Sequence, residues 1–415
     1  MNSSKPKGEP RQPSSLPLRL PVTVVGLGFV SLFTDISSEA IFPLLPAFLV
    51  SLGATSAFIG LVEGVAEFVA NTLKYLMGYV VDRRDRLKPL VLLGYGFSTL
   101  VRPLVAFATT PWHVLLVRAG DRIGKGVRTT PRDALIASAT DASMRARAYG
   151  FHRAMDHSGA VIGTLLASGL LWLLGATGGA TPENAEKMRT VFLFAAVPGL
   201  VAMTVLARTK EPSKRALDLT ANATNEGLSP TLKRALLALT LFGFANATDA
   251  FLIVKAAKLG ASPALAPMLW LTLHVVKAST ATRGGKLADK YGKRNALIFG
   301  WCVYALLWAA IGFVNSLGFL FLLTAIYGTS HGLVEGAERG LIADLASGRK
   351  RGAAFGAYNL LIGLAALISS TAFGAVWDHF GSAMAFCGSA AFALVAAAVL
   401  LFLLPAHRLT TSNPT

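Results

Sequence analysis

Charged residues are scarce in this chain of 415 residues, since Asp, Glu, Lys and Arg together make up 15% of it. A soluble domain of this length carries roughly 25%, so the shortfall argues against a water-soluble protein. Cysteine is scarcer still: Cys302 and Cys387 each stand inside an apolar run. Two cysteines placed in this way provide neither a disulfide framework nor a metal-binding spacing.

Signatures of catalysis are also missing. The sequence has no H-E-x-x-H zinc motif, no phosphate-binding Walker loop and no nucleophile–base pair of a known type. These absences argue against a membrane-embedded enzyme and against a pump driven by its own ATPase domain. We therefore expect no enzymatic activity, no cofactor and no bound metal.

Apolar residues dominate what is present. They make up 53% of the chain, with 40 glycines and a mean hydropathy of +0.55. A membrane-spanning helix needs about 20 mostly apolar residues, and glycine is common in such helices. Twelve candidate spans can be placed, which predicts an all-α membrane protein with twelve transmembrane helices. They cover about 21–52, 57–80, 89–108, 112–135, 149–174, 190–208, 235–256, 264–287, 294–315, 317–344, 353–376 and 381–404.

The longest polar stretch, from Arg208 to Arg234, divides the spans into two sets of six. The N-terminal residues are polar, basic and rich in proline, and they lack the short apolar core of a signal peptide. We therefore predict five parts. They are a cytoplasmic tail at 1–20, a six-helix bundle at 21–208, a cytoplasmic linker at 209–234, a second six-helix bundle at 235–404 and a tail at 405–415.

The formal net charge of +17 comes from Lys and Arg that recur in alternate loops rather than on one soluble face. A nucleic-acid-binding protein would gather them in one patch. An excess of Lys and Arg in every second loop is instead typical of the cytoplasmic side of a membrane protein. The pattern predicts cytoplasmic termini and an even number of spans, in the inner membrane of a bacterium.

The two halves repeat one another. Leu135, Tyr149 and Gly126 are matched 206 residues later by Leu341, Phe355 and Gly332. Several matches at one separation indicate a duplicated six-helix unit in parallel orientation.

A loop motif of the form G-x-x-x-D-[RK]-x-G-x-[RK] follows the second helix of each half. The first copy has Gly78, Asp82 and Arg83; the second, 207 residues later, has Gly285, Asp289, Lys290, Gly292 and Arg294. This loop resembles the signature of the major facilitator superfamily, a family of two-bundle secondary transporters. The resemblance implies close helix packing at the glycine and an aspartate that latches the cytoplasmic side to a helix N-terminus. The first copy departs from the pattern at Asp85, which replaces the second glycine.

Ionisable side chains inside predicted spans are costly in lipid and mark solute or ion pathways. Asp35 and Glu39 lie four residues apart on the first span, and Thr248-Asp249 on the seventh span echoes Thr34-Asp35. We expect these aspartates to face a central cavity, where Asp35 is a candidate proton-coupling residue. The alternative is that they are polar groups in helix packing.

The fourth span is unusually basic. Its site candidates are Arg118, Asp121, Arg122, Lys125 and Arg128. Arg118, Arg122 and Lys125 share one helix face, which suits an anionic solute, and Asp121 can pair with Arg118 or Lys125 on the same helix. A salt-bridged packing network that includes Glu63 and Glu67 is the alternative. The string from Gly120 to Leu135 also resembles one subgroup of uncharacterised bacterial major facilitator proteins.

The fifth span opens with His152, Arg153 and Asp156. His152 and Asp156 share a face and form a candidate proton relay near the cytoplasmic entrance. A metal site made from this segment is the alternative, but no helical face collects three good ligands without the adjacent Arg153. Metal transport is therefore disfavoured.

The second half carries His274 and Lys277 on its eighth-span face, and His331 and Glu335 on its tenth span. An isolated lysine is costly within a membrane, so Asp249 is the expected partner of Lys277. In the repeat, Lys125 aligns with His331 and Arg132 with Glu338, which predicts a latch of opposite charges between the halves. Packing within one half is the alternative.

These patterns together predict a monomeric secondary transporter in which two bundles rock about a central site. The surplus of basic side chains favours a small anionic solute, with protons as the coupling ion and the lipid bilayer as the surroundings. Efflux of amphipathic drugs or of metal chelates is the alternative within this class. A membrane anchor or receptor does not explain charges on matched faces of both halves.

Overall fold

The computed structural model describes residues 20–140, 144–211, 228–346 and 351–404, and in these ranges the chain forms helices and no strand. The first half contains these elements: α1 (Val22–Glu39), the 3₁₀ turn η1 (Phe42–Leu44), α2 (Leu45–Ser51), α3 (Ser56–Asp82), α4 (Lys88–Val101), the 3₁₀ turn η2 (Arg102–Phe107), α5 (Pro111–Ala139), α6 (Arg145–Leu173), α7 (Pro182–Phe194) and α8 (Ala196–Arg208).

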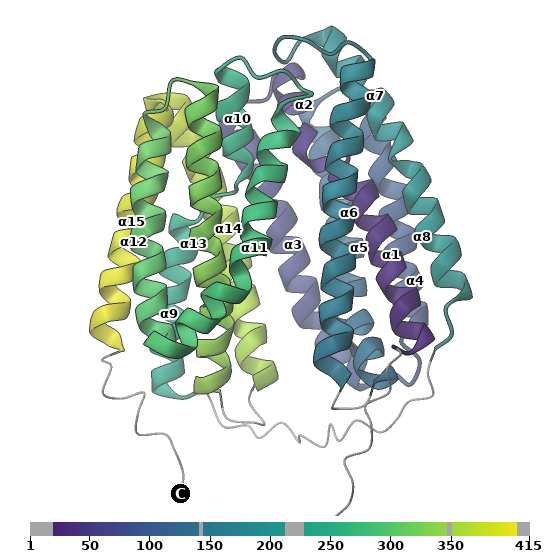
Figure 1. Ribbon diagram of the computed structural model, residues 1–415, viewed down its shortest axis with the longest axis vertical. Coiled ribbons are helices and arrows are strands. Elements are labelled where there is room, and N and C mark those ends of the chain that lie inside the picture. Colours follow the sequence, from purple (N-terminus) through teal and green to yellow (C-terminus); the bar gives the residue numbers. More distant parts are fainter. Residues whose placement is uncertain (1–19, 141–143, 212–227, 347–350, 405–415) are drawn as a thin grey trace, which may run out of the picture.

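The second half begins after the predicted linker, most of which lies outside the described residues. It contains α9 (Pro230–Ala245), α10 (Ala250–Lys258), α11 (Ala266–Tyr291), α12 (Lys293–Gly312), α13 (Leu317–Leu345), α14 (Arg351–Phe380) and α15 (Ser382–Leu403). The described ends, at the start of α1 and at the end of α15, lie at the same lower end of the molecule (Figure 1).

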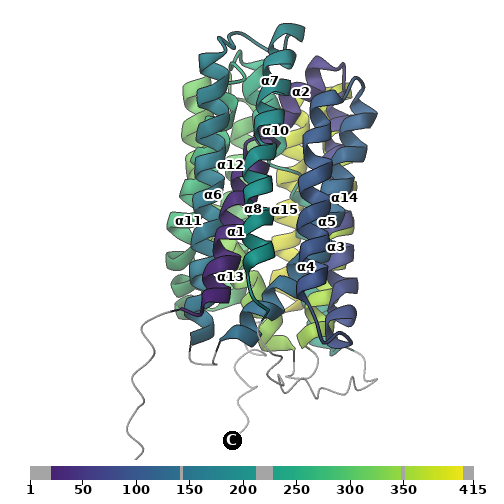
Figure 2. The ribbon, with the colours of Figure 1, turned by 90° about the vertical axis from the view of Figure 1, so that its right-hand side faces the viewer.

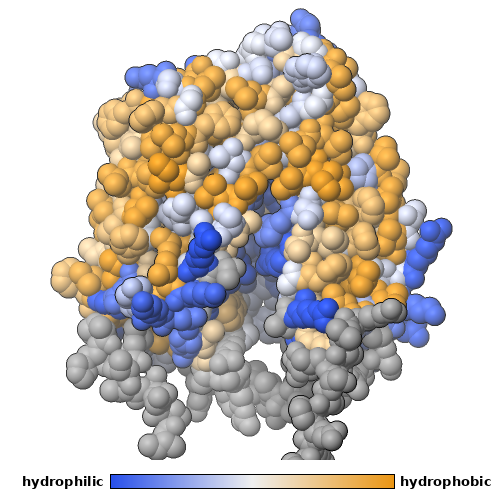
Figure 3. Space-filling view, viewed as in Figure 1, coloured by the Kyte–Doolittle hydropathy of each residue, from blue (hydrophilic) through white to orange (hydrophobic). Residues whose placement is uncertain are grey.

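Two bundles of roughly parallel helices stand side by side, one from α1 to α8 and the other from α9 to α15 (Figures 1 and 2). Their outer surface is largely apolar over its middle, while polar side chains gather at the lower end (Figure 3). A hollow with polar walls opens between the bundles in the lower half of this face. The described structure is therefore a state that opens toward the lower end.

Within the described ranges, nine helical segments are long and apolar enough to cross a membrane. Three further helices, α5, α6 and α11, are long enough but are not among these segments, because they are too polar or too charged. They are the helices that carry Lys125, Asp156 and Lys277, so their low hydropathy has the same origin as the predicted site. The chain is thus an all-helical, multi-pass membrane protein.

The first and seventh predicted spans are both interrupted. The first breaks between α1 and α2, where Phe42 to Leu44 form a 3₁₀ turn that contains Pro43. The other breaks between α9 and α10, where the backbone N–H of Thr248 donates to Ser370 Oγ on α14 at 3.1 Å. Irregular backbone at membrane depth persists where protein groups or a cavity satisfy it. Both breaks therefore point to a cavity between the bundles.

The two bundles pack most closely where α3 meets α14. A Cβ atom on Gly60 would lie 1.9 Å from the carbonyl oxygen of Ser370, and one on Gly64 would lie 2.7 Å from the Cα of Leu367. Small residues four apart allow helix backbones to approach in this way. The glycines that bring the bundles together therefore stand in the upper half of α3.

Gly60→Ala is expected to destabilise the protein by about 1–3 kcal/mol, because overpacking a tight helix contact forces the backbones apart. Thermal unfolding of the purified protein in detergent measures the effect. Gly78→Ala on the same helix is the matched control, since no described atom outside its own helix lies within 4 Å of its Cβ position, and alanine there is expected to be neutral or stabilising. Equal stability of the two variants would contradict this account of the α3–α14 contact.

Candidate functional site

Two adjoining cavities lie between the bundles. The upper cavity has a volume of about 430 Å³ and is lined by both bundles, mainly by α3, α5, α11, α14 and the break before α10. The lower cavity, of about 340 Å³, is lined chiefly by α1, α5 and α6. The two share five lining residues: Glu39, Phe42, Arg122, Lys125 and His274. The two cavities therefore form one path with two compartments.

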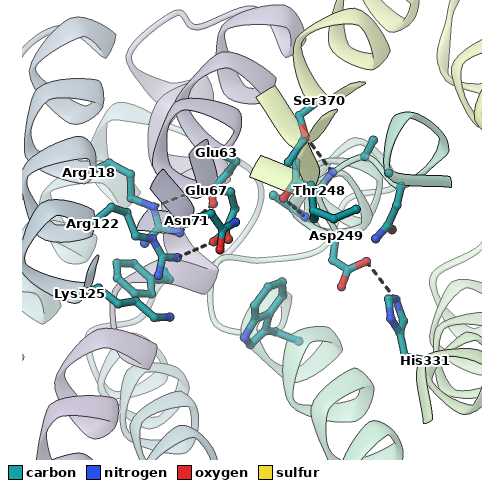
Figure 4. Close-up of a pocket in the computed structure, with 18 of the residues that line it drawn as sticks. Glu63, Glu67, Asn71, Arg118, Arg122, Lys125, Thr248, Asp249, His331 and Ser370 are labelled. Carbon is teal, nitrogen blue, oxygen red and sulfur yellow. Dashed lines mark hydrogen bonds and ion pairs between the residues drawn. The ribbon is translucent and has the colours of Figure 1, made fainter. Parts of the chain in front are cut away.

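The predicted basic stripe of α5 faces the upper cavity, as Figure 4 shows for Arg118, Arg122 and Lys125. Arg118 is held by Glu63 of α3 at 2.7 Å, and Arg122 Nη2 lies 3.5 Å from Glu67 Oε1. No ion pair joins Lys125 to any residue in the described ranges. The packing-network alternative therefore describes the two arginines, whereas Lys125 remains a cation without an internal partner at the junction of the two cavities.

Neither partner that the spacing along α5 offers Asp121 is the one observed. Asp121 pairs with Arg102 of η2 at 2.9 Å, and both side chains are almost fully buried. The same guanidinium donates to the carbonyl oxygen of Thr34 and to Ser37 Oγ, so it ties η2 and α5 to α1. Spacing along α5 alone left Arg118 and Lys125 as candidates, because a third helix cannot be seen from helical periodicity. The signal that could have revealed this pair is Arg102 itself, an arginine inside the apolar third span.

Arg128 is directed into helix packing. Its guanidinium lies 4.5 Å from the centre of the Tyr95 ring and donates to Ser98 Oγ at 2.7 Å. Beside it, a Cβ atom on Gly124 would lie 2.5 Å from the carbonyl oxygen of Gly94, so α4 and α5 touch there. Arg128 lines the lower cavity but is buried, and its contacts indicate a structural contribution.

Phe42 at the break of the first span covers the arginine cluster. Its ring centre lies 3.7 Å from the guanidinium carbon of Arg118, 5.1 Å from that of Arg122 and 5.8 Å from that of Arg102. Cation–π contacts of this kind hold the guanidinium planes. Arg118 Nη1 and Arg122 Nε and Nη1 nevertheless have no hydrogen-bond acceptor in the described structure. Buried donors of this kind favour the binding of an acceptor-rich group nearby.

The predicted pairing of Lys277 with Asp249 is confirmed. Lys277 Nζ lies 2.7 Å from Asp249 Oδ2 at the break before α10. The hydroxyl of Tyr327 donates to Asp249 Oδ1 at 2.7 Å, and His331 Nε2 lies 2.7 Å from that hydroxyl and 3.9 Å from Oδ1. The four side chains form a network within the second bundle, and Asp249 and His331 reach the upper cavity (Figure 4).

Asp35 and Glu39 lie on one face of α1 and both line the lower cavity. Glu39 also lines the upper cavity and accepts a hydrogen bond from Trp270 Nε1 of α11 at 2.9 Å, a contact between the bundles. The Trp270 ring in turn packs against His274 at 4.8 Å. The carboxylate of Asp35 makes no hydrogen bond or ion pair within the part of the chain that the structure describes.

His152 and Asp156 are neighbours on α6, with His152 Nδ1 3.5 Å from Asp156 Oδ2. Asp156 also accepts a hydrogen bond from Ser31 Oγ. His152 is buried behind this carboxylate and lines neither cavity, whereas Asp156 and Arg153 line the lower one. A relay through His152 would therefore reach the cavity by way of Asp156.

Of the two acidic side chains of α13, the one that lines the cavity is not the predicted site residue Glu335. Glu335 is exposed, pairs with Arg339 at 3.1 Å and lines neither cavity. Glu338 lines the upper cavity and accepts a hydrogen bond from Tyr358 at 2.7 Å. Side chains three residues apart on a helix differ in direction by about 60°, and here that difference leaves Glu335 exposed while Glu338 reaches the cavity. Glu338 therefore replaces Glu335 as the acidic residue of α13 at the site.

The charge pairs expected between the halves are not made in this state. Arg132 pairs with its neighbour Asp133 at 2.8 Å, and Glu338 with Tyr358 of its own bundle. The hollow at the lower end keeps the two bundles apart there (Figure 3).

The motif loops lie at this open end. Gly292 has a φ of 87°, so it supplies the turn between α11 and α12, and Arg294 donates to the carbonyl oxygen of Leu401 at 2.9 Å. Arg83 caps the end of α3, while the side chain of Asp82 lies outside the described residues. Asp289 and Lys290 are exposed, and within the described ranges Asp289 makes no ion pair. The latch that the resemblance implies is therefore not formed by Asp289 here.

Close packing is not observed at Gly78, since no described atom outside its own helix lies within 4 Å of its Cβ position, whereas the Cα of Gly285 lies 3.8 Å from the Cβ position of Gly336 on α13. Glu211, which the sequence did not reveal as important, contacts the segment after the first motif loop. The carboxylate of Glu211, after α8, accepts from the backbone N–H groups of Leu87 and Lys88 at 2.6 and 3.1 Å. It caps the start of α4 after a loop that lacks the second glycine.

Among the described residues, no group of three His, Cys, Asp or Glu side chains is placed to hold a metal ion. The functional groups of the described site are instead ion pairs, basic side chains without an ion-pair partner such as Lys125, and aromatic rings. These features suit the binding of a polar solute between two bundles.

Comparison with known proteins places this geometry in a family. The model of the Major Facilitator Superfamily matches residues 27–273 and 236–415. An uncharacterized MFS-type transporter of Methanocaldococcus jannaschii is 30% identical over 91% of this chain and 94% of its own length. A multidrug resistance protein, MdtH of Yersinia pestis, is 26% identical over 84% of this chain and 85% of its own length.

A solved structure has the same fold. The bacterial homologue of the human lysosomal transporter Spinster, in an inward-facing and occupied conformation, matches with a TM-score of 0.77 at 18% identity, covering 92% of this chain and 96% of that one. The chain belongs to the major facilitator superfamily. It is a membrane transporter of a small-molecule substrate and not an enzyme.

Proposed function

We propose that this protein is a secondary active transporter that carries a small anionic solute by alternating access, coupled to protons. It acts as a monomer in the inner membrane of a bacterium. Twelve spans form two six-helix bundles at 21–208 and 235–404, joined by a cytoplasmic linker at 209–234 and flanked by cytoplasmic tails at 1–20 and 405–415. The observation that carries the proposal is Lys125, which lies where the two cavities meet and makes no ion pair within the described ranges.

The count of twelve spans rests on adding α5, α6 and α11 to the nine apolar segments. Each of the three is 26 to 29 residues long, enough for about 39–44 Å of helix at 1.5 Å per residue. Their charged side chains face the cavities or one another, which makes their low hydropathy compatible with a membrane. The basic loops between α3 and α4 and between α11 and α12 then lie in the cytoplasm.

The ion pairs and hydrogen bonds of the site support an anionic solute, because most of its acidic side chains already have partners. Glu63 is paired with Arg118, Asp249 with Lys277, and Glu39 with the indole of Trp270. Lys125 has no such partner, and the nearby donors Arg122 Nε and Nη1 lack acceptors. A carboxylate or phosphate bound at this junction would satisfy both groups.

A transport screen tests the proposal. Everted vesicles that contain the protein, with an imposed pH gradient, are offered monocarboxylates, dicarboxylates and organic phosphates alongside cationic dyes. We expect one anionic class to accumulate or to be expelled in a manner that depends on the gradient. Accumulation of a cation with all anions inert would overturn the anionic assignment.

Proton coupling is proposed for Asp35, a carboxylate that lines the lower cavity without a partner in the described ranges. Asp35→Asn is expected to abolish uphill movement driven by a pH gradient while leaving solute exchange down a concentration gradient within about twofold. Counterflow in proteoliposomes measures the exchange. Asp344→Asn, in an exposed pair with Lys293, serves as the control for loss of one carboxylate. If the Asp35→Asn protein still concentrates solute on a proton gradient, Asp35 is not the coupling residue.

Efflux of amphipathic drugs is a second candidate, favoured by two observations. One relative carries the name of a multidrug resistance protein. In addition, aromatic side chains line the upper cavity, among them Phe42, Phe242, Trp270 and Tyr358. The dyes in the same screen separate the two candidates, because an efflux protein would expel them against their gradient.

A further inference from the structure

The carboxylate of Asp378, near the end of α14, contacts the first turn of α3 in the other bundle. It accepts hydrogen bonds from the backbone N–H of Ser56 at 3.0 Å and from that of Ala57 at 2.8 Å. The next amide, that of Phe58, donates at 3.2 Å to Thr55 Oγ1, which belongs to the same bundle as α3. The start of α3 is thus capped from both bundles.

The position of Asp378 favours the contact between bundles rather than its own helix. A carboxylate is stabilising at a helix N-terminus, where free N–H groups and the helix dipole present positive charge. Asp378 stands two residues before the end of α14, where a negative charge opposes the dipole of α14. The acid therefore gains its stabilisation from α3.

This contact closes one end of the site. Beside it, a Cβ atom on Gly374 would lie 2.2 Å from the carbonyl oxygen of Ser56, so the two backbones touch. Ser370, one turn earlier on α14, lines the upper cavity. The hollow between the bundles opens at the other, lower end (Figure 3). Any opening of the upper cavity toward the far side has to part α3 from α14 at this point.

We propose that Asp378 is a latch that holds the upper end closed in the state described here and releases α3 when the transporter opens to that side. Two charge-assisted hydrogen bonds that exist in one state and not in the other stabilise the first state selectively. Their removal is expected to shift the ratio of the two states by about tenfold or more toward the form that is open at the upper end.

Distances between spin labels at the upper end measure this ratio. Thr110→Cys at the start of α5 and Asn315→Cys between α12 and α13 are exposed positions in different bundles. They are labelled in a background with both native cysteines replaced by serine, in lipid nanodiscs. Asp378→Asn is expected to raise the population with the longer distance about tenfold relative to the unmutated sequence. Since no solute is added, the result is independent of the solute and coupling ion proposed above.

A matched control separates the latch from the stability of the helix. Thr55→Ala removes the side-chain cap that α3 receives from its own bundle together with a side-chain contact to Asp378, but it leaves both backbone donors to Asp378 in place. It is expected to lower the thermal stability and to shift the distances by far less than Asp378→Asn does. A shift in this variant as large as that in Asp378→Asn would overturn the proposal, because weakening of α3 itself would then explain both.

A second variant removes one donor without altering Asp378. Ser56 is the first residue of α3, a position that tolerates proline, and the preceding Thr55 has the extended ψ of 164° that proline requires. Ser56→Pro deletes the N–H that faces Asp378 and is expected to shift the distances in the same direction. The shift in the double variant Ser56→Pro/Asp378→Asn should be smaller than the sum of the two single shifts, because both changes act on the same contact.

A shift in both single variants that clearly exceeds the shift in Thr55→Ala supports the latch. Folded Asp378→Asn protein with the unmutated distance distribution overturns it. If Asp378→Asn is not recovered in folded form, Ser56→Pro decides in its place, and an unchanged distribution in that variant overturns the latch equally.

Discussion

Replacement of Lys125 by glutamine is expected to raise the concentration of anionic solute needed for half-maximal transport by roughly 30- to 1,000-fold. That range corresponds to about 2–4 kcal/mol, typical of losing one charge from a close, desolvated pair. Lys125 is the expected partner of the solute because it lines both cavities and has no ion pair within the described ranges. Initial rates of uptake or efflux against solute concentration give the measurement.

Two variants make this result interpretable. Lys125→Arg keeps the charge and is expected to retain most of the affinity. Lys187→Gln removes a lysine that pairs with Glu183 near the start of α7, and it should leave transport unchanged. Unimpaired transport of the same anion by the Lys125→Gln protein would contradict the assignment of Lys125 to the solute.

Loss of either partner in the Asp249–Lys277 pair is expected to be the most destabilising change of charge in the second bundle. Breaking a buried pair leaves a single charge away from water, which costs about 3–5 kcal/mol when burial is complete. Here the side chains are 16% and 20% exposed, so we expect about 2–4 kcal/mol for Asp249→Ala or Lys277→Met. Thermal unfolding in detergent measures both.

The two single variants should differ in severity. Lys277→Met leaves Asp249 with the hydroxyl of Tyr327 and with His331 nearby, whereas Asp249→Ala leaves Lys277 without an anion. Asp249→Ala is therefore expected to be the worse of the two. The double variant should recover at least half of the loss, because it leaves no unpaired charge. A double variant no more stable than either single one would show that the pairing does not determine stability.

The exposed pair of Lys293 and Asp344 provides a control. Its nitrogen–oxygen distance of 2.6 Å is similar to that of the buried pair, but its side chains are 24% and 58% exposed. Solvent screening reduces such a pair to less than about 1 kcal/mol. Single neutralisations there should change the stability little, and the contrast isolates the effect of burial from the effect of distance.

The pairing of Lys277 with Asp249 was predictable from sequence because a lone lysine in an apolar span has few acids to choose from. The partner of Asp121 was not, since Arg102 comes from a separate helix that periodicity along α5 does not reveal. The same limit explains why Glu338 rather than Glu335 lines the cavity: the two lie about 60° apart on the same side of α13, and only packing determines which of them meets the cavity.

The glycines give a similar contrast. The motif pointed to Gly78 as a packing position, yet no described atom outside its own helix lies within 4 Å of its Cβ position. Gly60 and Gly64 instead allow the backbones of α3 and α14 to touch. Which glycine is in contact depends on which end of the transporter is closed, and that is a property of the conformation.

The sequence by itself determined that this is a duplicated helical membrane protein of the major facilitator type, because hydropathy, the repeat and the loop motif are local and additive signals. It also determined which charged side chains enter the spans. The tertiary structure alone decided which of these charges are satisfied by Glu63, Arg102 or Tyr358 and which, like Lys125, remain available. The physical reason is that an ion pair between helices depends on their packing and rotation, which no single helix encodes.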